Sequence, residues 1–107
     1  MKNRHLLQQI RSAIQDSGLN LTLHAQIQMT TRRIAVSDIR QALFSSEAEL
    51  LEDYSEDPRG PSCLLYGKAG DRVLHIHLSQ PPGIVVITAY EPDPARWEAG
   101  LKSRKRE

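Results

Sequence analysis

Residues 72–79 read Arg-Val-Leu-His-Ile-His-Leu-Ser, and this stretch decides the fold. Apolar and polar side chains alternate from Leu74 to Leu78, which is the period of a β-strand with one buried face. The aliphatic residues therefore point toward a core, and His75 and His77 share the opposite face. A glycine-rich turn precedes the stretch and a Pro-Pro-Gly turn follows it, so its neighbours in sequence are antiparallel strands.

Three further segments carry strand signals. We predict strands over Leu50–Tyr54, Ser62–Tyr66 and Ile84–Tyr90. The last of these is apolar on both faces, and we expect Val85 and Ile87 to join the core. Thr88 and Tyr90 would then lie on the same sheet face as the two histidines.

The segment before the strands is helical in its periodicity. We predict helices over Asn3–Asp16 and Leu23–Arg33 and a third one capped by Ser37. Leu23, Ile27 and Ile34 would form the inner stripe of the second helix, helped by Met29 and Thr30, with Thr22 as its N-cap. The predicted fold is therefore α+β, with N-terminal helices packed on a four-stranded antiparallel meander.

Length and composition limit the organisation of the chain. Its 107 residues predict a single domain over residues 1–100, followed by a basic tail over residues 101–107. The tail is either a solvated end or a tether for an anion. One cysteine, Cys63, allows neither an intrachain disulfide nor a cysteine-rich zinc site. We find no signal peptide and no membrane-spanning stretch, and we expect a cytoplasmic protein with no membrane partner.

The shared face of the histidine strand is the best candidate for chemistry. Imidazoles beside a hydroxyl and a phenol suit acid–base work on a phosphodiester, with Tyr90 as a second proton-transfer group. An ordinary solvated sheet face would show the same alternation. Metal binding by His75 and His77 is a weaker reading, because no third ligand stands at a suitable spacing. We predict no cofactor and no metal.

Three other residues outside that strand are candidates. His24 opens the second helix and could act as a base, or it could bond to a neighbouring backbone group. Arg32 closes the same helix and could clamp phosphate, although a cation at a helix C-terminus is also common. Arg59 lies between two prolines, where it could hold an anion or form a surface pair with Asp57.

The chain also resembles a known family along most of its length. Residues 24–43 are similar to the opening of the small bacterial family called domain of unknown function 4258. The run Pro-Arg-Gly-Pro-Ser-Cys at residues 58–63 and Tyr-Glu-Pro at residues 90–92 are similar to its more specific motifs. The sequence departs from the family pattern at Gln28, Arg33 and His77, where arginine, glycine and an aliphatic residue are usual.

The resemblance implies a function that composition alone does not. Members of the family look like toxin partners of small zinc-finger antitoxins, and they are grouped with barnase–RelE-like ribonuclease folds. The polar positions that match the family are His24, Arg32, Arg59, His75, Tyr90 and Glu91. We therefore expect a metal-independent endoribonuclease of the toxin–antitoxin kind, with an RNA substrate and a zinc-finger-type antitoxin as partners.

Two other functions fit the same residues. A non-catalytic binding module would dock a peptide or regulator on the same sheet face or on an open edge strand. A degraded toxin would keep the fold alone. For the enzyme, we expect His75, His24 and Tyr90 to transfer protons and Arg32 and Arg59 to bind RNA.

Overall fold

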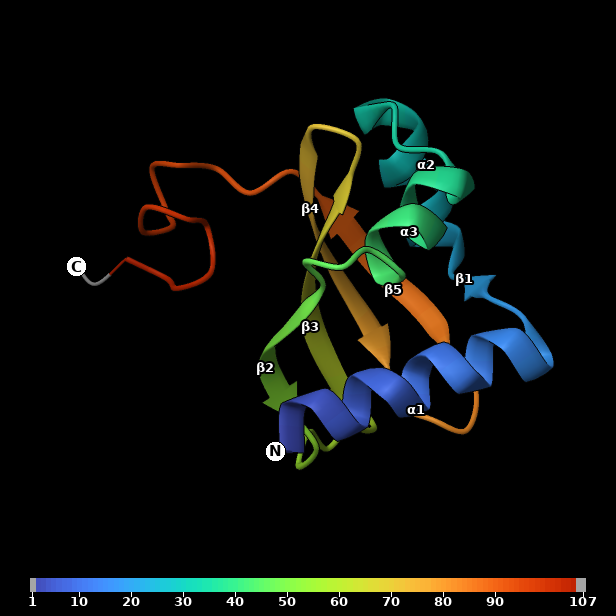
Figure 1. Cartoon of the computed structure of the whole chain (residues 1–107). Helices are drawn as coiled ribbons and strands as arrows, with labels where there is room; N and C mark the ends of the chain where they lie inside the picture. The colour runs from blue at the N-terminus through green and yellow to red at the C-terminus, as the bar shows by residue number, and fades with distance from the viewer. Residues whose placement is uncertain (1, 106–107) are drawn as a thin grey trace.

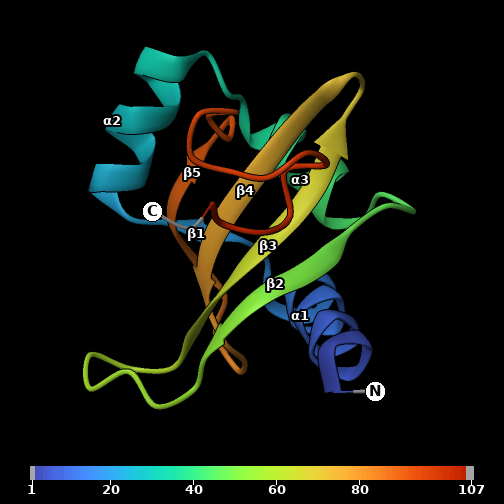
Figure 2. The same ribbon diagram turned by 90° about the vertical axis from the view of Figure 1, so that its left-hand side faces the viewer.

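The computed structural model describes residues 2–105, with side chains from residue 5 onward. Within this range the chain forms three helices and one five-stranded sheet. Helices α1 (Lys2–Ser17) and α3 (Val36–Leu43) lie on one face of the sheet, and α2 (Leu23–Arg32) lies beside strand β5 (Val85–Tyr90) near one edge of the sheet (Figure 1). The C-terminal segment crosses the opposite face (Figure 2). No helix in residues 2–105 is both long and apolar enough to span a bilayer.

The sheet is mixed rather than purely antiparallel. Its strands are β1 (Asn20–Leu21), β2 (Glu49–Tyr54), β3 (Ser62–Ala69), β4 (Arg72–Ser79) and β5 (Val85–Tyr90). They are ordered β1-β5-β4-β3-β2, and all neighbours are antiparallel except β1 and β5. The α+β class is confirmed, but the predicted four-stranded antiparallel meander is wrong because it lacks the parallel strand β1.

Strand β1 is too short to carry a sequence signal of its own. Asn20 donates its backbone N–H to Ile84 O at 3.1 Å, and Thr22 donates to Val86 O at 3.1 Å. Further along β5, the Thr22 hydroxyl reaches Ile87 O at 3.4 Å and the Arg32 guanidinium donates to Ala89 O at 2.7 Å. Side chains at both ends of α2 therefore satisfy carbonyls on the edge of β5 that no strand covers.

The starts of α2 and α3 follow different capping rules. The Thr22 hydroxyl accepts a hydrogen bond from Ala25 N at 2.9 Å, so the predicted cap of α2 is confirmed. The predicted cap of α3 at Ser37 is wrong, because the helix begins at Val36 and Ala35 is its N-cap. Alanine has no acceptor, and instead the Asp38 carboxylate accepts from Ala35 N at 2.8 Å.

The inner stripe predicted for α2 is partly wrong. Leu23 and Ile27 are 71% and 59% exposed, whereas Met29 and Ile34 are buried as predicted and Ala25 is buried as well. The reason is the position of α2 at the sheet edge, where the helix turns the side with small Ala25 toward β5. An apolar patch on α2, formed by Leu23 and Ile27, is consequently left on the surface.

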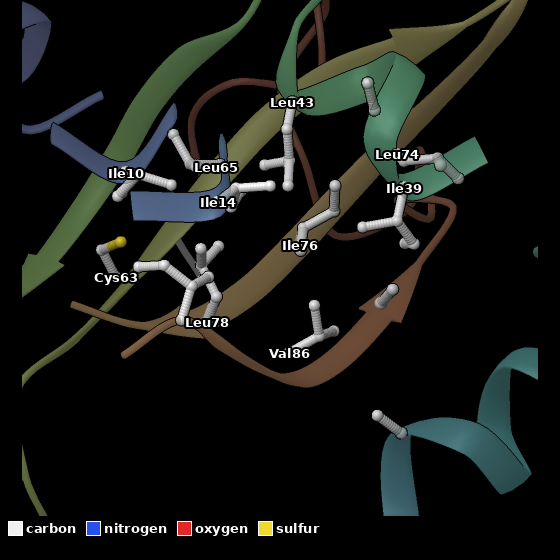
Figure 3. Packing of buried hydrophobic residues seen from close by; sticks show 14 of the residues in the cluster. Ile10, Ile14, Ile39, Leu43, Cys63, Leu65, Leu74, Ile76, Leu78 and Val86 are labelled. Atoms are coloured by element: carbon white, nitrogen blue, oxygen red, sulfur yellow. The ribbon is translucent and has the colours of Figure 1, made fainter. Parts of the chain in front are cut away.

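The core lies between the sheet and the helices (Figure 3). Leu74, Ile76 and Leu78 are completely buried there, as the alternation in β4 predicts. Cys63 is also buried, and loss of hydration raises the pKa of its thiol to about 12. A group so difficult to ionise behaves as a small apolar side chain.

The predicted alternation of buried and exposed side chains is wrong in the first half of β5. Val86 is buried, whereas Val85 and Ile87 are partly exposed. A β-bulge causes this, because Leu78 pairs with Val86 while the preceding His77 pairs with Thr88. Ile87 is the extra residue, and it shifts the alternation by one position.

Strand β3 continues past the predicted end at Tyr66. It runs through Gly67 to Ala69 and packs against α3. A Cβ at Gly67 would lie only 2.2 Å from Ala42 O of that helix. The glycine therefore allows the strand and the helix backbone to approach closely, rather than forming part of a turn.

Candidate functional site

The face of the sheet turned away from the helices is rich in polar groups. His77 of β4 pairs with Leu64 of β3 and with Thr88 of β5. His75 pairs in the same way with Tyr66 and Tyr90. The predicted convergence of two imidazoles, a hydroxyl and a phenol on one face follows from these registers.

The C-terminal segment, residues 91–105, folds back over one half of this face (Figure 2). It makes a tight reversal in which Glu98 N donates to Ser103 O at 2.7 Å and Lys105 N donates to Arg96 O at 2.9 Å. Trp97 and Arg104 form an antiparallel bridge across the reversal. Residues 101–105 of the predicted tail therefore lie against the sheet face (Figure 2), although residues 102–105 remain exposed.

Four contacts attach the C-terminal segment to the strands. His75 Nε2 is bonded to Leu101 O at 2.6 Å, and the His75 ring meets Trp97 edge-on with centroids 4.3 Å apart. Arg104 donates two hydrogen bonds to the Glu52 carboxylate, at 2.8 and 3.0 Å. Lys102 lies 3.3 Å from Glu49. These contacts bury His75 completely.

The His75 side chain is consequently inaccessible to solvent in this conformation. Burial lowers the pKa of its imidazole below the ordinary value, and the bond to Leu101 opposes that shift only in part. Its Nδ1 is buried without a hydrogen-bond partner among the described residues. The sequence prediction placed His75 on the polar face, which is correct, but the covering by Trp97 and Leu101 carries no local signal.

The other half of the face is open and contains a groove. Three hollows of about 630, 450 and 480 Å³ adjoin one another in a path along this face, since neighbouring hollows share lining residues. The first two share Arg59 and His77, and the last two share Tyr90 and Arg104. We call this path the polar groove, and His77 lies where its first two parts meet.

His77 is held in place but remains accessible. Its Nε2 is bonded to the Ser62 hydroxyl at 2.9 Å, and the Tyr54 ring meets it edge-on at 5.7 Å. No bond to Nδ1 is found within residues 2–105, and this atom is not sealed from solvent. Partial burial lowers the pKa of His77, and the Arg59 charge lowers it further, while Asp57 and Glu52 oppose the shift. His77 is therefore neutral near pH 7.

Two guanidinium groups line the same hollow as this imidazole. Arg59 is 89% exposed and pairs with Asp57 at 3.1 Å, so the surface pair considered in the sequence does form. Arg104 enters the groove from the C-terminal segment. Its bonds to Glu52 raise the pKa of the guanidinium and lower that of the carboxyl. Both arginines keep N–H donors beyond those bonds, because a guanidinium has five.

Two phenols complete the central part of the groove. The Tyr54 hydroxyl donates to Glu52, and burial raises the pKa of Tyr54. Tyr90 lies diagonally across the strand pair from His77, and burial raises its pKa as well. Both phenols are therefore protonated at neutral pH and are potential proton donors.

The predicted site residues are only partly brought together. Tyr90, Arg32 and Arg59 line the groove, and Gln28 links Arg32 to Thr88 by hydrogen bonds to both side chains. His75 is beside the groove under the C-terminal segment. His24 is exposed on α2 and lines none of the three hollows.

Sequence reasoning missed three residues that shape the groove. Tyr54 and Glu52 are alternate residues of β2, and this spacing could have placed them together on one face. Arg104 had no such signal, because its partner Glu52 is 52 positions away. Within residues 2–105 we find no group of three His, Cys, Asp or Glu side chains placed to hold a metal ion.

The chain belongs to the family described as domain of unknown function (DUF4258), whose model matches residues 21–91. The matched region begins at β1 and ends just after β5, so it includes His77, Arg59 and Tyr90. It excludes α1 and Arg104. Searches of curated proteins and of solved structures give no match.

Proposed function

We propose that the protein is a metal-independent endoribonuclease of the toxin–antitoxin kind, and that the polar groove binds the RNA. The observation that carries the proposal is the neutral, accessible His77 in a hollow that is also lined by Arg59, Arg104 and Tyr90. Phosphodiester transesterification needs a general base, a general acid and positive charge near the phosphorane, and an imidazole, a phenol and two guanidinium groups can fill these roles.

In the proposed reaction, Nδ1 of His77 removes the proton from a ribose 2′-hydroxyl. The proposal assigns the ring proton to Nε2, which lies 2.9 Å from the Ser62 hydroxyl, so that Nδ1 is the unprotonated nitrogen. The 2′-oxygen then bonds to the adjacent phosphorus, and the bond from phosphorus to the 5′-oxygen breaks. The Tyr90 hydroxyl gives its proton to the leaving 5′-oxygen. The products are a 2′,3′-cyclic phosphate and a free 5′-hydroxyl, and water returns both residues to their starting states.

Arg59 and Arg104 stabilise the charge that develops on the phosphorane oxygens. Arg104 is the more fixed of the two, since its bidentate pairing with Glu52 limits its rotamers. Arg59 is held only by the neighbouring Asp57, and it can turn toward the substrate at little cost. Every proton and charge in the reaction is handled by a side chain, so the activity should persist in a chelator.

The antitoxin partner is part of the same proposal. A zinc-finger-type antitoxin would restrain the toxin by covering the polar groove. The alternative function, a non-catalytic binding module, is favoured by a different observation, which is the exposed apolar patch of Leu23 and Ile27 on α2. The two functions differ in whether RNA is cut.

The test is expression of the chain without its genomic neighbours, followed by mapping of RNA ends. We expect growth arrest and 2′,3′-cyclic phosphate ends in the cells. The purified protein should produce the same RNA ends in the presence of EDTA. His77→Ala should lower the cleavage rate about 10²–10⁴-fold, the usual loss for a positioned base. His24→Ala is the matched control, because it removes an exposed imidazole outside the groove and should leave cleavage unchanged.

Normal growth with intact RNA at high expression would reject the enzyme and leave the binding module. Equal cleavage by wild type and His77→Ala would reject the assignment of the base. His75→Ala separates the two histidines of β4, since it should lower thermal stability by opening a buried site and should affect cleavage only through that loss.

A further inference from the structure

The polar groove extends beyond the residues that the proposed reaction uses. Past Tyr90 and Arg104 it enters a hollow of about 480 Å³ that is also lined by Arg32, Arg96 and Trp97. Two carboxylates, Glu91 and Asp93, lie on its wall. No step of the cleavage reaction requires Arg32 or Arg96. The bond to Ala89 O explains why Arg32 lies here, but it does not explain the second arginine, Arg96.

The two carboxylates do not cancel the positive charge of this hollow. Glu91 is paired with Arg72, which lies outside it, at 3.1 Å. Asp93 accepts a bond from Ala95 N at 2.9 Å but keeps its negative charge, so it offsets one of the two charges of Arg32 and Arg96 and leaves the other. Arg96 forms no ion pair with any residue in the part of the chain that the structure describes. The hollow therefore presents cationic donors that an anion can bind.

The two arginines differ in how firmly they are placed. The Arg32 guanidinium is anchored by its 2.7 Å bond to Ala89 O and is held next to β5. The backbone of Arg96 is fixed by bonds from its N–H to Asp93 O and from Lys105 N to its carbonyl, both at 2.9 Å. Its side chain remains exposed. One rigid and one adaptable guanidinium in the same hollow can both donate hydrogen bonds to one phosphate.

We infer that this hollow is a second phosphate subsite, which binds a phosphate one nucleotide away from the scissile one. The inference rests on the proposed function and adds the class of substrate, which is single-stranded RNA at least three nucleotides long. Tyr90 lies between the two subsites and lines both of them. Its half-exposed ring offers a surface on which the intervening base can stack, and only an unpaired base can do so.

Arg96→Ala tests the subsite without touching the proposed catalytic groups. For a hexaribonucleotide, we expect kcat/KM to fall about 10–100-fold, the usual worth of a charged hydrogen bond, with the loss mostly in KM. For a dinucleoside monophosphate, whose single phosphate is the scissile one, kcat/KM should change less than about twofold. The salt dependence of hexanucleotide binding should weaken by about one phosphate contact.

Arg40→Ala is the charge-matched control, since it removes an exposed arginine from α3 on the other side of the sheet. Equal losses on both substrates, or no loss on either, would overturn the subsite even if His77→Ala abolished cleavage. Binding of a 2′-deoxy hexanucleotide separates the two proposals. If wild type binds it more tightly than Arg96→Ala but cleaves no RNA, the subsite stands and the ribonuclease is rejected.

Discussion

Gly67→Ala is the sharpest test of how the sheet and α3 are packed. A Cβ built on Gly67 lies 2.2 Å from Ala42 O, 2.7 Å from its carbonyl carbon and 3.0 Å from its Cα. The shortest of these is about 1.2 Å inside ordinary van der Waals contact. All three atoms belong to the backbone of α3, so no side chain can rotate to relieve the overlap. The whole helix or the strand must move.

Overpacking that displaces the backbone destabilises a protein more than overpacking that only rotates side chains. We expect a loss of about 3 kcal/mol or more in the free energy of unfolding. For a domain of this size that corresponds to a fall of roughly 10–20 °C in melting temperature. Circular dichroism on heating and a urea titration would measure both quantities. Because α3 lies behind the sheet, the fraction that remains folded should keep its cleavage rate.

Gly83→Ala is the matched control for the same substitution. Its Cβ would meet nothing within 4 Å, and the backbone there does not require a positive φ. Its stability should stay within about 0.5 kcal/mol of wild type. If Gly67→Ala were as stable as Gly83→Ala, the close approach of β3 to Ala42 would be refuted, and the longer β3 with it.

Two further predictions concern pH. Arg59→Ala removes a positive charge that lowers the pKa of His77, and it frees the Asp57 carboxylate, which raises that pKa. The acidic limb of the pH profile of kcat/KM should therefore move to higher pH. If this limb does not move, the assignment of His77 as the base is contradicted. His75 has a lowered pKa in the folded protein, so the unfolded state binds more protons below about pH 6.5. Stability should therefore be complete above that pH and fall as the pH decreases through it. Urea midpoints at pH 7.5 and 5.5 would measure this, and His75→Phe should show a smaller difference between them than wild type.

Local patterns predicted the parts of the fold that local physics determines. The alternation in residues 72–79 correctly separated the buried aliphatic side chains from the histidines. The same rule failed on β5, because the bulge at Ile87 depends on how β5 pairs with β4 and not on its own sequence. The helical periodicity of α2 placed Leu23 and Ile27 on the wrong side, because a helix at the edge of a sheet buries a narrower stripe than one that lies across a face.

The candidate site was also predictable only in part from the sequence. Strand alternation was enough to place His75, His77 and Tyr90 on one face. The choice between the two histidines depends on the C-terminal segment, which covers His75 and leaves His77 open. Arg104 and Trp97 hold that segment through contacts with strands far away in sequence, and a basic tail gives no indication of such contacts.

The parallel pairing of β1 with β5 also constrains the order in which the chain folds. Thr22 and Ile87, which meet beside this pair, are 65 residues apart. A contact of such long range forms late, since the intervening chain must already be compact before closing the loop is favourable. During synthesis the apolar side of α1 therefore has no partner until the strands that cover it have been made. We expect the emerging N-terminal third to depend on chaperones or to remain unfolded until β5 has been translated.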